Sequence, residues 1–213
     1  MISPPVTVFV IDDDASVRKS LKRLLDAAHH KTEVFKSASE FLSRSPHPGP
    51  SCIIVDVRMP GVTGIDLQKT LIDTGREEQL VFITAHGDIP MCAQAMKAGA
   101  VDFLPKPFKP KELLESVERA LSRSSEKLLL ASERNRAHAL LQQLTPREYE
   151  VMELVAAGLL NKQVGGELGM AEKTVKTHRA HVMQKLGITS VAELMVVLQK
   201  AEVTPPARPG TKV

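Results

Sequence analysis

Four short apolar runs in the first half of the chain each lead into a polar side chain. They occupy residues 6–11, 52–55, 80–84 and 101–104. Stretches with helical spacing of apolar residues lie between the later runs, at residues 65–73 and 90–97. Short buried strands that alternate with amphipathic helices form parallel sheets with both faces covered. The first half is therefore predicted to be a doubly wound, parallel α/β domain.

The second half changes to an all-helical pattern. Residues 111–144 are charged, helical in spacing and free of Pro and Gly, which predicts a helix that continues into a helical linker. The Ser-rich residues 122–125 are the expected place of a break. Thr145, Pro146 and Glu148 then form a capping-box signature at the start of a new helix.

Residues that end or begin helices divide the chain after Leu144 into four short helices. Glycines at 158, 169 and 187 end the first three, Asn161 is expected to cap the second, and Ser190 begins a fourth that reaches residue 200. We expect an α/β domain at residues 1–121, a helical linker at 122–143, a four-helix domain at 144–201 and a disordered tail at 202–213.

Composition narrows the class of protein. With 213 residues, 43% of them hydrophobic and 25% charged, the chain resembles an ordinary soluble protein of two domains. No apolar run is long enough to cross a bilayer and residues 1–5 lack the features of a secretory signal, so a cytoplasmic protein without a membrane partner is expected. Cys52 and Cys92 are expected to be two buried thiols that serve as small apolar side chains, without a disulfide or a zinc site.

Charge is distributed unevenly between the two halves. Residues 122–213 carry 13 Lys and Arg against 9 Asp and Glu, whereas residues 1–121 carry 15 against 16. The basic excess of the helical half would suit a phosphate-binding surface.

The polar residues at the ends of the strands predict one pocket, because open parallel sheets bind ligands at the carboxyl ends of their strands. They are Asp12, Asp13, Asp56, Thr84 and Lys106. Each alone has an ordinary explanation, such as a helix cap or a surface turn. Three carboxylates together repel one another unless a hard cation such as Mg²⁺ neutralises them, and a lysine and a hydroxyl would bind phosphoryl oxygens. The set predicts phosphoryl transfer by positioning and charge neutralisation.

The runs VFVIDDDASVRKSL, IIVDVRMPGVTGIDL and VFITAHGDIPMCAQAMKAGAVDFLPKPF resemble the receiver domain of bacterial two-component response regulators, over about residues 5–121. The resemblance implies a five-stranded, CheY-like or flavodoxin-like receiver in which Asp56 is the phosphoacceptor. It also implies Mg²⁺ as the cofactor, held by Asp13, Asp56, the backbone carbonyl of Arg58 and, through water, Asp12.

The same resemblance assigns further roles. Lys106 would contact the phosphoryl group, Thr84 would move to hydrogen-bond it, and Phe103 would be the switch aromatic. The Lys106-Pro107 pair occupies the position of the family's cis peptide. Such a receiver is not an enzyme for other substrates; it promotes its own Mg²⁺-dependent phosphorylation and dephosphorylation.

Two neighbouring residues suggest a hypothesis about the lifetime of the phosphorylated state. Arg58 and His86 lie two residues after Asp56 and Thr84, where side chains would overhang the phosphoryl group. We expect them to control the access of attacking water. The alternative is that both side chains simply point into solvent.

A rival class of phosphoaspartyl proteins is the haloacid-dehalogenase phosphatases, whose nucleophile lies in a DxDx(T/V) motif after the first strand. Asp12, Asp14 and Ser16 approach this motif but fail at its last position. A second domain of the effector kind also follows, so the receiver interpretation is favoured.

The segment LTPREYEVMELVAAGLLNKQVGGELGMAEKTVKTHRAHVMQKLGITSVAEL resembles the LuxR-type helix-turn-helix of the FixJ/NarL response regulators, over about residues 144–200. Part of it is similar to the branch that includes StyR and TodT, which regulate the catabolism of aromatic compounds. The resemblance implies a scaffold helix at residues 161–168 and a recognition helix at 172–186 for the major groove of DNA.

The spacing of the recognition helix supports two faces. An inward stripe is formed by Val175, His178, Val182 and Leu186. The opposite, basic face is expected to contain no acid and consists of Lys173, Lys176, Thr177, Ala180 and Gln184. A solvated helix face is the alternative interpretation for an isolated helix of this kind.

The resemblance also implies individual DNA contacts. Lys176 and Thr177 should face bases, whereas Lys162, Thr174 and Arg179 should mostly contact phosphates. Ala180 stands where some relatives have a third base contact and can only touch a thymine methyl group.

Three residues depart from a stable helical pattern. Ala171 replaces the usual Ser N-cap, which costs roughly 1 kcal/mol. Gly165 and Gly166 lie inside the scaffold helix, and each costs up to about 1 kcal/mol relative to Ala. The second domain is therefore expected to be marginally stable.

The resemblance implies that a sensor histidine kinase phosphorylates the receiver, and that phosphorylation promotes a homodimer that binds promoter DNA, with RNA polymerase as a further partner. Apolar residues at Ile89, Met91, Ala95 and Met96 form either part of the core or the surface that pairs the receivers. The alternative function is a phosphorylation-independent DNA-binding regulator whose receiver is only a dimerisation module.

Overall fold

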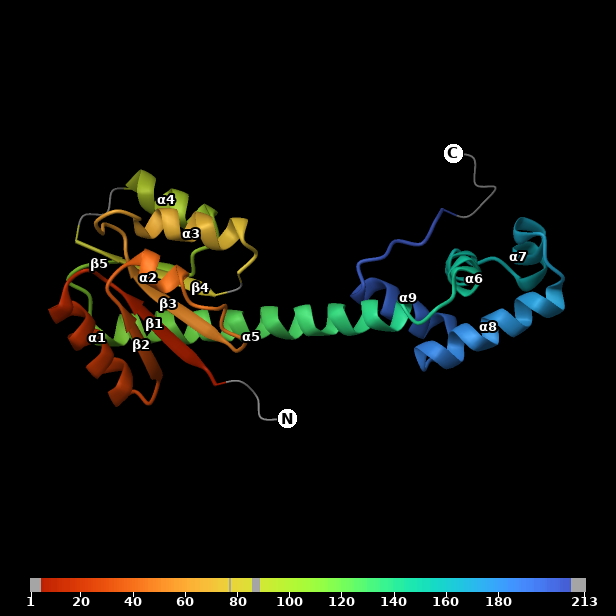
Figure 1. The fold of residues 1–213 in the computed structure, drawn as a ribbon, viewed down its shortest axis with the longest axis horizontal. Helices are drawn as coiled ribbons and strands as arrows, with labels where there is room; N and C mark the ends of the chain where they lie inside the picture. The colour runs from red at the N-terminus through yellow and green to blue at the C-terminus, as the bar shows by residue number, and fades with distance from the viewer. Residues whose placement is uncertain (1–4, 77, 86–88, 208–213) are drawn as a thin grey trace. The chain divides into compact units, whose positions relative to one another are not determined.

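The computed structural model describes residues 5–76, 78–85 and 89–207, and it divides the chain into two compact units. The first unit is Met1–Leu129 and the second is Leu130–Val213 (Figure 1). The division falls inside the expected linker of residues 122–143.

The first unit is built on a five-stranded parallel sheet with the strand order β2-β1-β3-β4-β5. Its strands are β1 (Thr7–Ile11), β2 (Lys31–Phe35), β3 (Ser51–Asp56), β4 (Gln79–Thr84) and β5 (Asp102–Pro105). The helices that connect or follow them are α1 (Ala15–Ala27), α2 (Ala38–Leu42), α3 (Gly64–Asp73), α4 (Ile89–Lys97) and α5 (Pro110–Leu141). The predicted doubly wound, parallel α/β fold is confirmed.

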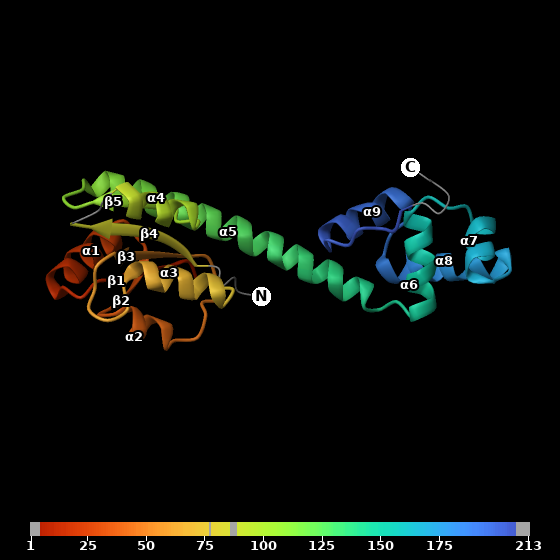
Figure 2. The same ribbon diagram turned by 90° about the horizontal axis from the view of Figure 1, so that it is seen from above.

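The side chains of alternate residues of β1 point to opposite faces of the sheet. Phe9 and Ile11 pack in a core layer with residues of α2, α3 and α4. Val8 and Val10 pack in the opposite layer with residues of α1 and α5. Both faces are covered by helices (Figures 1 and 2), which explains why the central strands are continuous apolar runs.

Strand β2 was not singled out by the sequence because it lacks an apolar run. Its sequence is KTEVF, and within it Thr32 is buried while Lys31 is exposed. β2 lies at the edge of the sheet beside β1. An edge strand buries less surface than a central strand, so its composition can stay polar.

The expected break at residues 122–125 is wrong, because α5 runs without interruption from Pro110 to Leu141. Ser124 is buried there, and its hydroxyl oxygen accepts a hydrogen bond from the backbone N–H of Ser51 at 3.0 Å. The hydroxyl of Ser125 donates to the carbonyl oxygen of Leu121 at 2.9 Å. Both serine hydroxyl groups therefore have hydrogen-bond partners while their backbone stays helical, so neither serine ends α5.

The second unit contains α6 (Pro146–Ala156), α7 (Asn161–Leu168), α8 (Glu172–Leu186) and α9 (Val191–Lys200). Its core also includes Ala137 and Leu141 from the last turns of α5. Glu133 of α5 forms an ion pair of 3.3 Å with Lys200 of α9. The end of α5 is therefore part of this helical unit, which begins at Leu130 rather than at residue 144.

The segment after α9 is partly packed. Ala201 is buried and Val203 packs against the core of the second unit, although disorder was expected from residue 202. Residues 208–213 of the expected tail lie outside the described residues.

Most of the expected helix caps are present, among them Ser190 before α9 and Gly169 and Gly187 after α7 and α8, and one differs. The Thr145–Glu148 capping box at the start of α6 is present, and Ala171 is an N-cap without a side-chain hydrogen bond. Asn161, however, is not the N-cap of α7: Leu160 occupies that position, and its N–H donates to the Gln163 side chain at 2.8 Å. Gln163 thus satisfies the N–H of the cap residue itself, and no side chain of the cap residue binds the first turn of α7.

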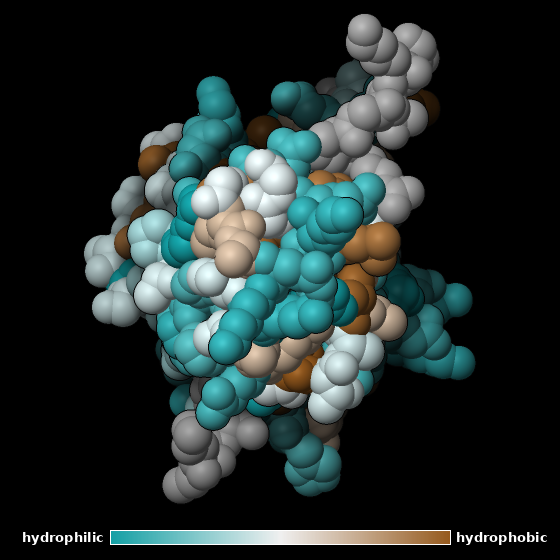
Figure 3. Space-filling model, turned by 90° about the vertical axis from the view of Figure 1, so that its right-hand side faces the viewer, coloured by the Kyte–Doolittle hydropathy of each residue, from teal (hydrophilic) through white to brown (hydrophobic). Residues whose placement is uncertain are grey.

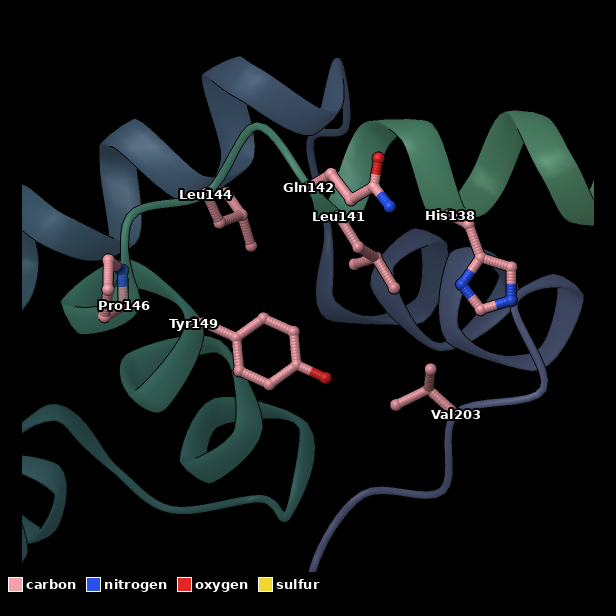
Figure 4. Close-up of a pocket in the computed structure, with 7 residues that line it drawn as sticks. All are labelled: His138, Leu141, Gln142, Leu144, Pro146, Tyr149 and Val203. Atoms are coloured by element: carbon pink, nitrogen blue, oxygen red, sulfur yellow. The ribbon is translucent and has the colours of Figure 1, made fainter.

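A groove of about 570 Å³ lies between the end of α5 and the start of α6. As Figure 4 shows, Leu141, Tyr149 and Val203 point toward this groove, and His138 lies at its side. The groove is part of the second unit.

In the described part of the chain, no helix by itself combines the length and the apolar character needed to cross a membrane. The bent pair α8 and α9 meets those criteria jointly, by length and composition alone.

Glu148 joins α6 to α8 through a buried carboxylate. This carboxylate accepts hydrogen bonds from Nζ of Lys185 at 2.6 Å and from the backbone N–H of Thr145 at 2.8 Å. Nδ1 of His181 lies 3.7 Å from it. The Lys185 ammonium and the Thr145 N–H lower the pKa of Glu148 from about 4.5 to about 2.

The two glycines of α7 differ in their surroundings. A Cβ atom on Gly165 would lie 2.6 Å from the backbone oxygen of Met170, whereas a Cβ atom on Gly166 would meet nothing within 4 Å. Gly165 also accepts a backbone hydrogen bond of 2.8 Å from the N–H of Met170. Gly165 is therefore required by the close turn after α7, and the expected cost relative to Ala applies only to Gly166.

We predict opposite effects from the two substitutions. Gly166→Ala should raise the free energy of unfolding of the second unit by up to about 1 kcal/mol, because Ala restricts the unfolded chain. Gly165→Ala should lower it by about 1–3 kcal/mol, because the new methyl group collides with the backbone. Tyr149 is the single tyrosine in a chain without tryptophan, so its fluorescence in a urea titration reports on this unit. Equal effects of the two substitutions would contradict the assignment.

The lowered pKa of Glu148 predicts acid sensitivity of the second unit. Because the folded pKa of about 2 lies below the ordinary value of 4.5, the carboxylate stabilises the unit fully above about pH 4.5 and loses this effect as the pH falls toward 2. Glu148→Gln should lower the free energy of unfolding at neutral pH, and its difference from the wild type should shrink over that acid range. A difference independent of pH, measured by Tyr149 fluorescence in urea, would contradict this prediction.

Candidate functional site

The carboxyl ends of the central strands lie side by side. In the parallel register, Ile11 of β1 pairs with Val55 of β3, and Thr84 of β4 pairs with Pro105 of β5. Asp56 is the last residue of β3 and pairs with Ile83. The residues that follow these strands therefore meet at one edge of the sheet, as the sequence predicted.

Lys106 connects two buried carboxylates at this edge. Its Nζ atom lies 2.8 Å from Oδ1 of Asp56 and 3.0 Å from Oδ2 of Asp12. The Asp12 and Asp56 residues are only 1% and 7% exposed. The N–H of Lys106 donates to the carbonyl oxygen of Thr84 at 2.7 Å, and the Lys106–Pro107 peptide is cis, as the resemblance implied.

The charges at this edge perturb one another. Burial raises the pKa of Asp12 above its ordinary value, and the hydrogen bond from Lys106 only partly opposes this effect. Burial alone would lower the pKa of Lys106, but the hydrogen bonds to Asp56 and Asp12 outweigh it and raise this pKa. A single ammonium group thus offsets two carboxylates.

Backbone groups hold the carboxylates in place. The N–H of Arg58 donates to Oδ2 of Asp56 at 2.8 Å, and the N–H of Asp14 donates to Oδ1 of Asp12 at 2.9 Å. Asp14 itself caps α1 through its hydrogen bond from the N–H of Ser16. Asp14 is thus a helix cap, the ordinary explanation for an acid after a strand.

Gly64 is a residue of the site that the sequence did not single out. A Cβ atom at this position would lie 2.5 Å from the backbone oxygen of Asp56. The N–H of Gly64 donates to the carbonyl oxygen of Val57 at 3.0 Å. Glycine therefore allows the start of α3 to approach the chain directly after β3. Only a contact in three dimensions reveals this need.

The donor chemistry of the site suits a hard divalent cation, because the carboxylates of Asp12, Asp13 and Asp56 supply oxygen only. Among the described residues, however, no three His, Cys, Asp or Glu side chains converge as a ligand set. Asp13 is exposed, while Lys106 occupies the space between the other two carboxylates. The residues fit Mg²⁺ by their chemistry.

The two expected switch residues lie on neighbouring strands. Thr84 is 1% exposed at the end of β4. Phe103 of β5 is partly buried, and its ring centroid lies 6.0 Å from that of Phe82. Phe82 and Phe103 are also direct partners in the register of the sheet.

Of the two residues expected to overhang the site, His86 lies outside the described residues. Arg58 has an exposed side chain beside Asp56. It lines a groove of about 500 Å³ together with Thr63, Met91 and Gln94. The backbone N–H of Arg58 contacts the carboxylate of Asp56, while its side chain lies along this groove.

In the second unit, the buried residues of α8 follow the predicted spacing. Val175, Val182 and Leu186 are buried. The exposed residues on or next to α8 and α7 include Lys162, Lys173, Thr174, Lys176, Thr177 and Ala180. Figure 3 views the end of this unit that carries α7 and the start of α8, and the surface seen there is largely hydrophilic.

Contacts within the unit refine the roles expected on this face. Nη1 of Arg179, which is partly buried, donates to Oδ1 of Asn161 at 3.1 Å and so links α8 to α7. The hydroxyl of Thr177 donates to the carbonyl oxygen of Lys173 at 3.2 Å. His178 is partly buried, and its Nδ1 atom has no hydrogen-bond partner in the described part of the chain.

The expectation that this face contains no acid is wrong. Glu172 lies in the first turn of α8, and its Oε1 atom is 2.9 Å from Nζ of Lys176. The two residues are four apart in the helix, so their side chains meet on its surface.

Two family models match the chain. The response regulator receiver domain matches residues 8–118, and the luxR family of bacterial regulatory proteins matches residues 142–198. The two matches correspond to the units that contain the carboxylate site and α8.

Similar proteins match over almost the whole length. Nodulation protein W of Bradyrhizobium diazoefficiens is 45% identical over 91% of this chain and 85% of its own. The response regulator protein TmoT of Ectopseudomonas mendocina is 37% identical over 91% of this chain and 88% of its own. The solved structure of the response regulator StyR is 47% identical with a TM-score of 0.82, covering 92% of this chain and 99% of that one.

Proposed function

The chain belongs to the two-component response regulators that combine a receiver domain with a LuxR-type DNA-binding domain, and from this premise we propose how it works. A sensor histidine kinase transfers a phosphoryl group to Asp56, and the phosphorylated protein pairs with a second copy and binds promoter DNA in the cytoplasm. RNA polymerase is the further partner on that DNA. The single observation that carries the proposal is the contact of Lys106 with the carboxylates of Asp56 and Asp12 at the carboxyl edge of the sheet.

Each side chain of the site has its own role in phosphoryl transfer. A carboxylate oxygen of Asp56 attacks phosphorus, the bond from phosphorus to the donor breaks, and the donor leaves with the electron pair. The ammonium group of Lys106 then offsets the charge on the phosphoryl oxygens, while the N–H of Arg58 holds the acceptor carboxylate. Catalysis is thus by orientation and charge.

Mg²⁺ is the cofactor in this proposal. Asp13, Asp56 and the backbone carbonyl of Arg58 would hold it, with Asp12 acting through water. When bound, the ion supplies positive charge that neutralises the carboxylates and the phosphoryl oxygens.

The signal leaves the site through Thr84 and Phe103, which move toward the phosphoryl group and change the surface of α4 and β5. On α4, Ala95 is buried and Met91 packs against the core, so these two residues are structural. Ile89 is 85% exposed and Met96 is 40% exposed. The exposed pair supports α4 as part of the surface that joins two receivers.

The DNA-binding unit reads the promoter with α8. Lys176 and Thr177 face bases, and Ala180 contacts a thymine methyl group. Thr177 donates its hydroxyl proton within the helix, so toward DNA it offers an acceptor and a methyl group. The residues proposed for phosphates and for the edge of the interface are Lys162, Lys173, Thr174 and Arg179. Because one such unit reads only a half-site, pairing raises affinity.

The function is tested by comparing the wild type with Asp56→Asn, each with and without beryllofluoride and Mg²⁺. Sedimentation should show that only the wild type shifts from monomer to dimer, and its affinity for promoter DNA should rise about tenfold or more. Asp56→Asn keeps the shape of the site and removes the acceptor. If both proteins bind DNA equally in all conditions, the receiver is only a dimerisation module and phosphorylation does not control it.

The position of Arg58 predicts a role in the lifetime of the phosphorylated state. Arg58→Ala should change the rate of dephosphorylation several-fold, because its exposed side chain, two residues after Asp56, would control the access of attacking water. Arg23→Ala, on the exposed surface of α1, is the matched control. His86→Ala tests the second half of the hypothesis, and unchanged phosphate release in both the Arg58 and His86 variants would refute it.

A further inference from the structure

The start of α8 carries an exposed ion pair. Oε1 of Glu172 lies 2.9 Å from Nζ of Lys176, and the two side chains are 46% and 62% exposed. Glu172 is the single acid in the sequence of α8, EKTVKTHRAHVMQKL. In a helix-turn-helix, the N-terminal residues of this helix are those that reach base edges.

Other basic residues of α8 have partners elsewhere in the unit. Lys185 is bound to Glu148 of α6, and Arg179 is bound to Asn161 of α7. Those contacts pack α8 against its neighbours. The contact between Glu172 and Lys176 is different, because both residues belong to α8 and both remain exposed.

A carboxylate at this position opposes nonspecific binding to DNA, since it repels phosphates and the acceptor groups of bases. It becomes favourable only opposite a hydrogen-bond donor. In the major groove, cytosine and adenine both present an amino donor, but the adenine amino group lies beside the acceptor N7, which repels a carboxylate. Glu therefore accepts a hydrogen bond from cytosine, whereas Lys donates to O6 and N7 of guanine.

We propose that Glu172 determines sequence specificity, by accepting a hydrogen bond from a cytosine amino group while holding the Lys176 ammonium toward a guanine. The proposal rests on the base-contacting role of Lys176 given above. Lys176 and Glu172 would thus contact neighbouring bases together, as an ion pair. The ion pair limits the positions of the ammonium group, and the carboxylate penalises sequences that offer no donor.

The experiment is selection from a library of randomised DNA duplexes by the full-length protein, activated with beryllofluoride and Mg²⁺. The wild type, Glu172→Gln, Glu172→Ala and Lys176→Ala are compared. Glu126→Gln is the matched control, because it removes the same charge from an exposed residue of α5 that has no ion pair among the described residues.

The wild type and Glu126→Gln should select a cytosine over other bases by about tenfold at one position of the half-site. Glu172→Gln should move this preference to adenine, because Gln pairs with N6 and N7 of adenine. Glu172→Ala should abolish it and raise the affinity for a duplex without the site. Lys176→Ala should weaken the selection of the neighbouring guanine.

Two outcomes separate the inference from the function on which it rests. If both Glu172 variants keep the cytosine preference and change only overall affinity, Glu172 merely stabilises the start of α8 and the proposal is overturned. If Lys176→Ala keeps the guanine preference, the base contact of Lys176 itself is wrong. A wild-type protein that selects no sequence would overturn both.

Discussion

The ammonium group of Lys106 allows two buried carboxylates to occupy the same edge of the sheet. A buried charge without a partner is strongly destabilising, and Asp12 and Asp56 lie too deep for water to screen them well. Lys106 reaches both because its backbone N–H is bound to the carbonyl of Thr84, at the end of the neighbouring strand. The site therefore depends on the parallel register of the central strands.

The same pair of carboxylates keeps the site ready for a cationic ligand or a phosphoryl group. One ammonium offsets two acids, so the edge of the sheet retains negative charge that a hard cation would neutralise. Gly64 is part of this arrangement, because a larger residue would collide with the backbone oxygen of Asp56. Asp56 is therefore constrained both by the charge of Lys106 on its carboxylate and by the close packing of Gly64 on its backbone oxygen.

In the second unit, the ion pairs at the two ends of α8 have different kinds of partner. Glu148 binds Lys185 near the end of α8 and fastens it to α6, whereas Glu172 and Lys176 leave the start of the helix exposed. Helix α5 contributes Leu113 and Val117 to the core of the first unit and Ala137 to that of the second. One helix is therefore a structural component of both units.

Strand runs, helix periods and caps are local properties of the chain, so the residues at the strand ends, the parallel α/β class and the helix-turn-helix could be predicted from the sequence. It could not reveal the edge strand β2, whose polar composition suits partial exposure, or the continuity of α5, where Ser124 finds a partner in Ser51. Only the tertiary structure showed that Gly165 is required while Gly166 is not, and that Glu148 of α6 binds Lys185 of α8. Close backbone approaches and ion pairs depend on where atoms meet in space, and the order of residues in a chain does not specify such meetings.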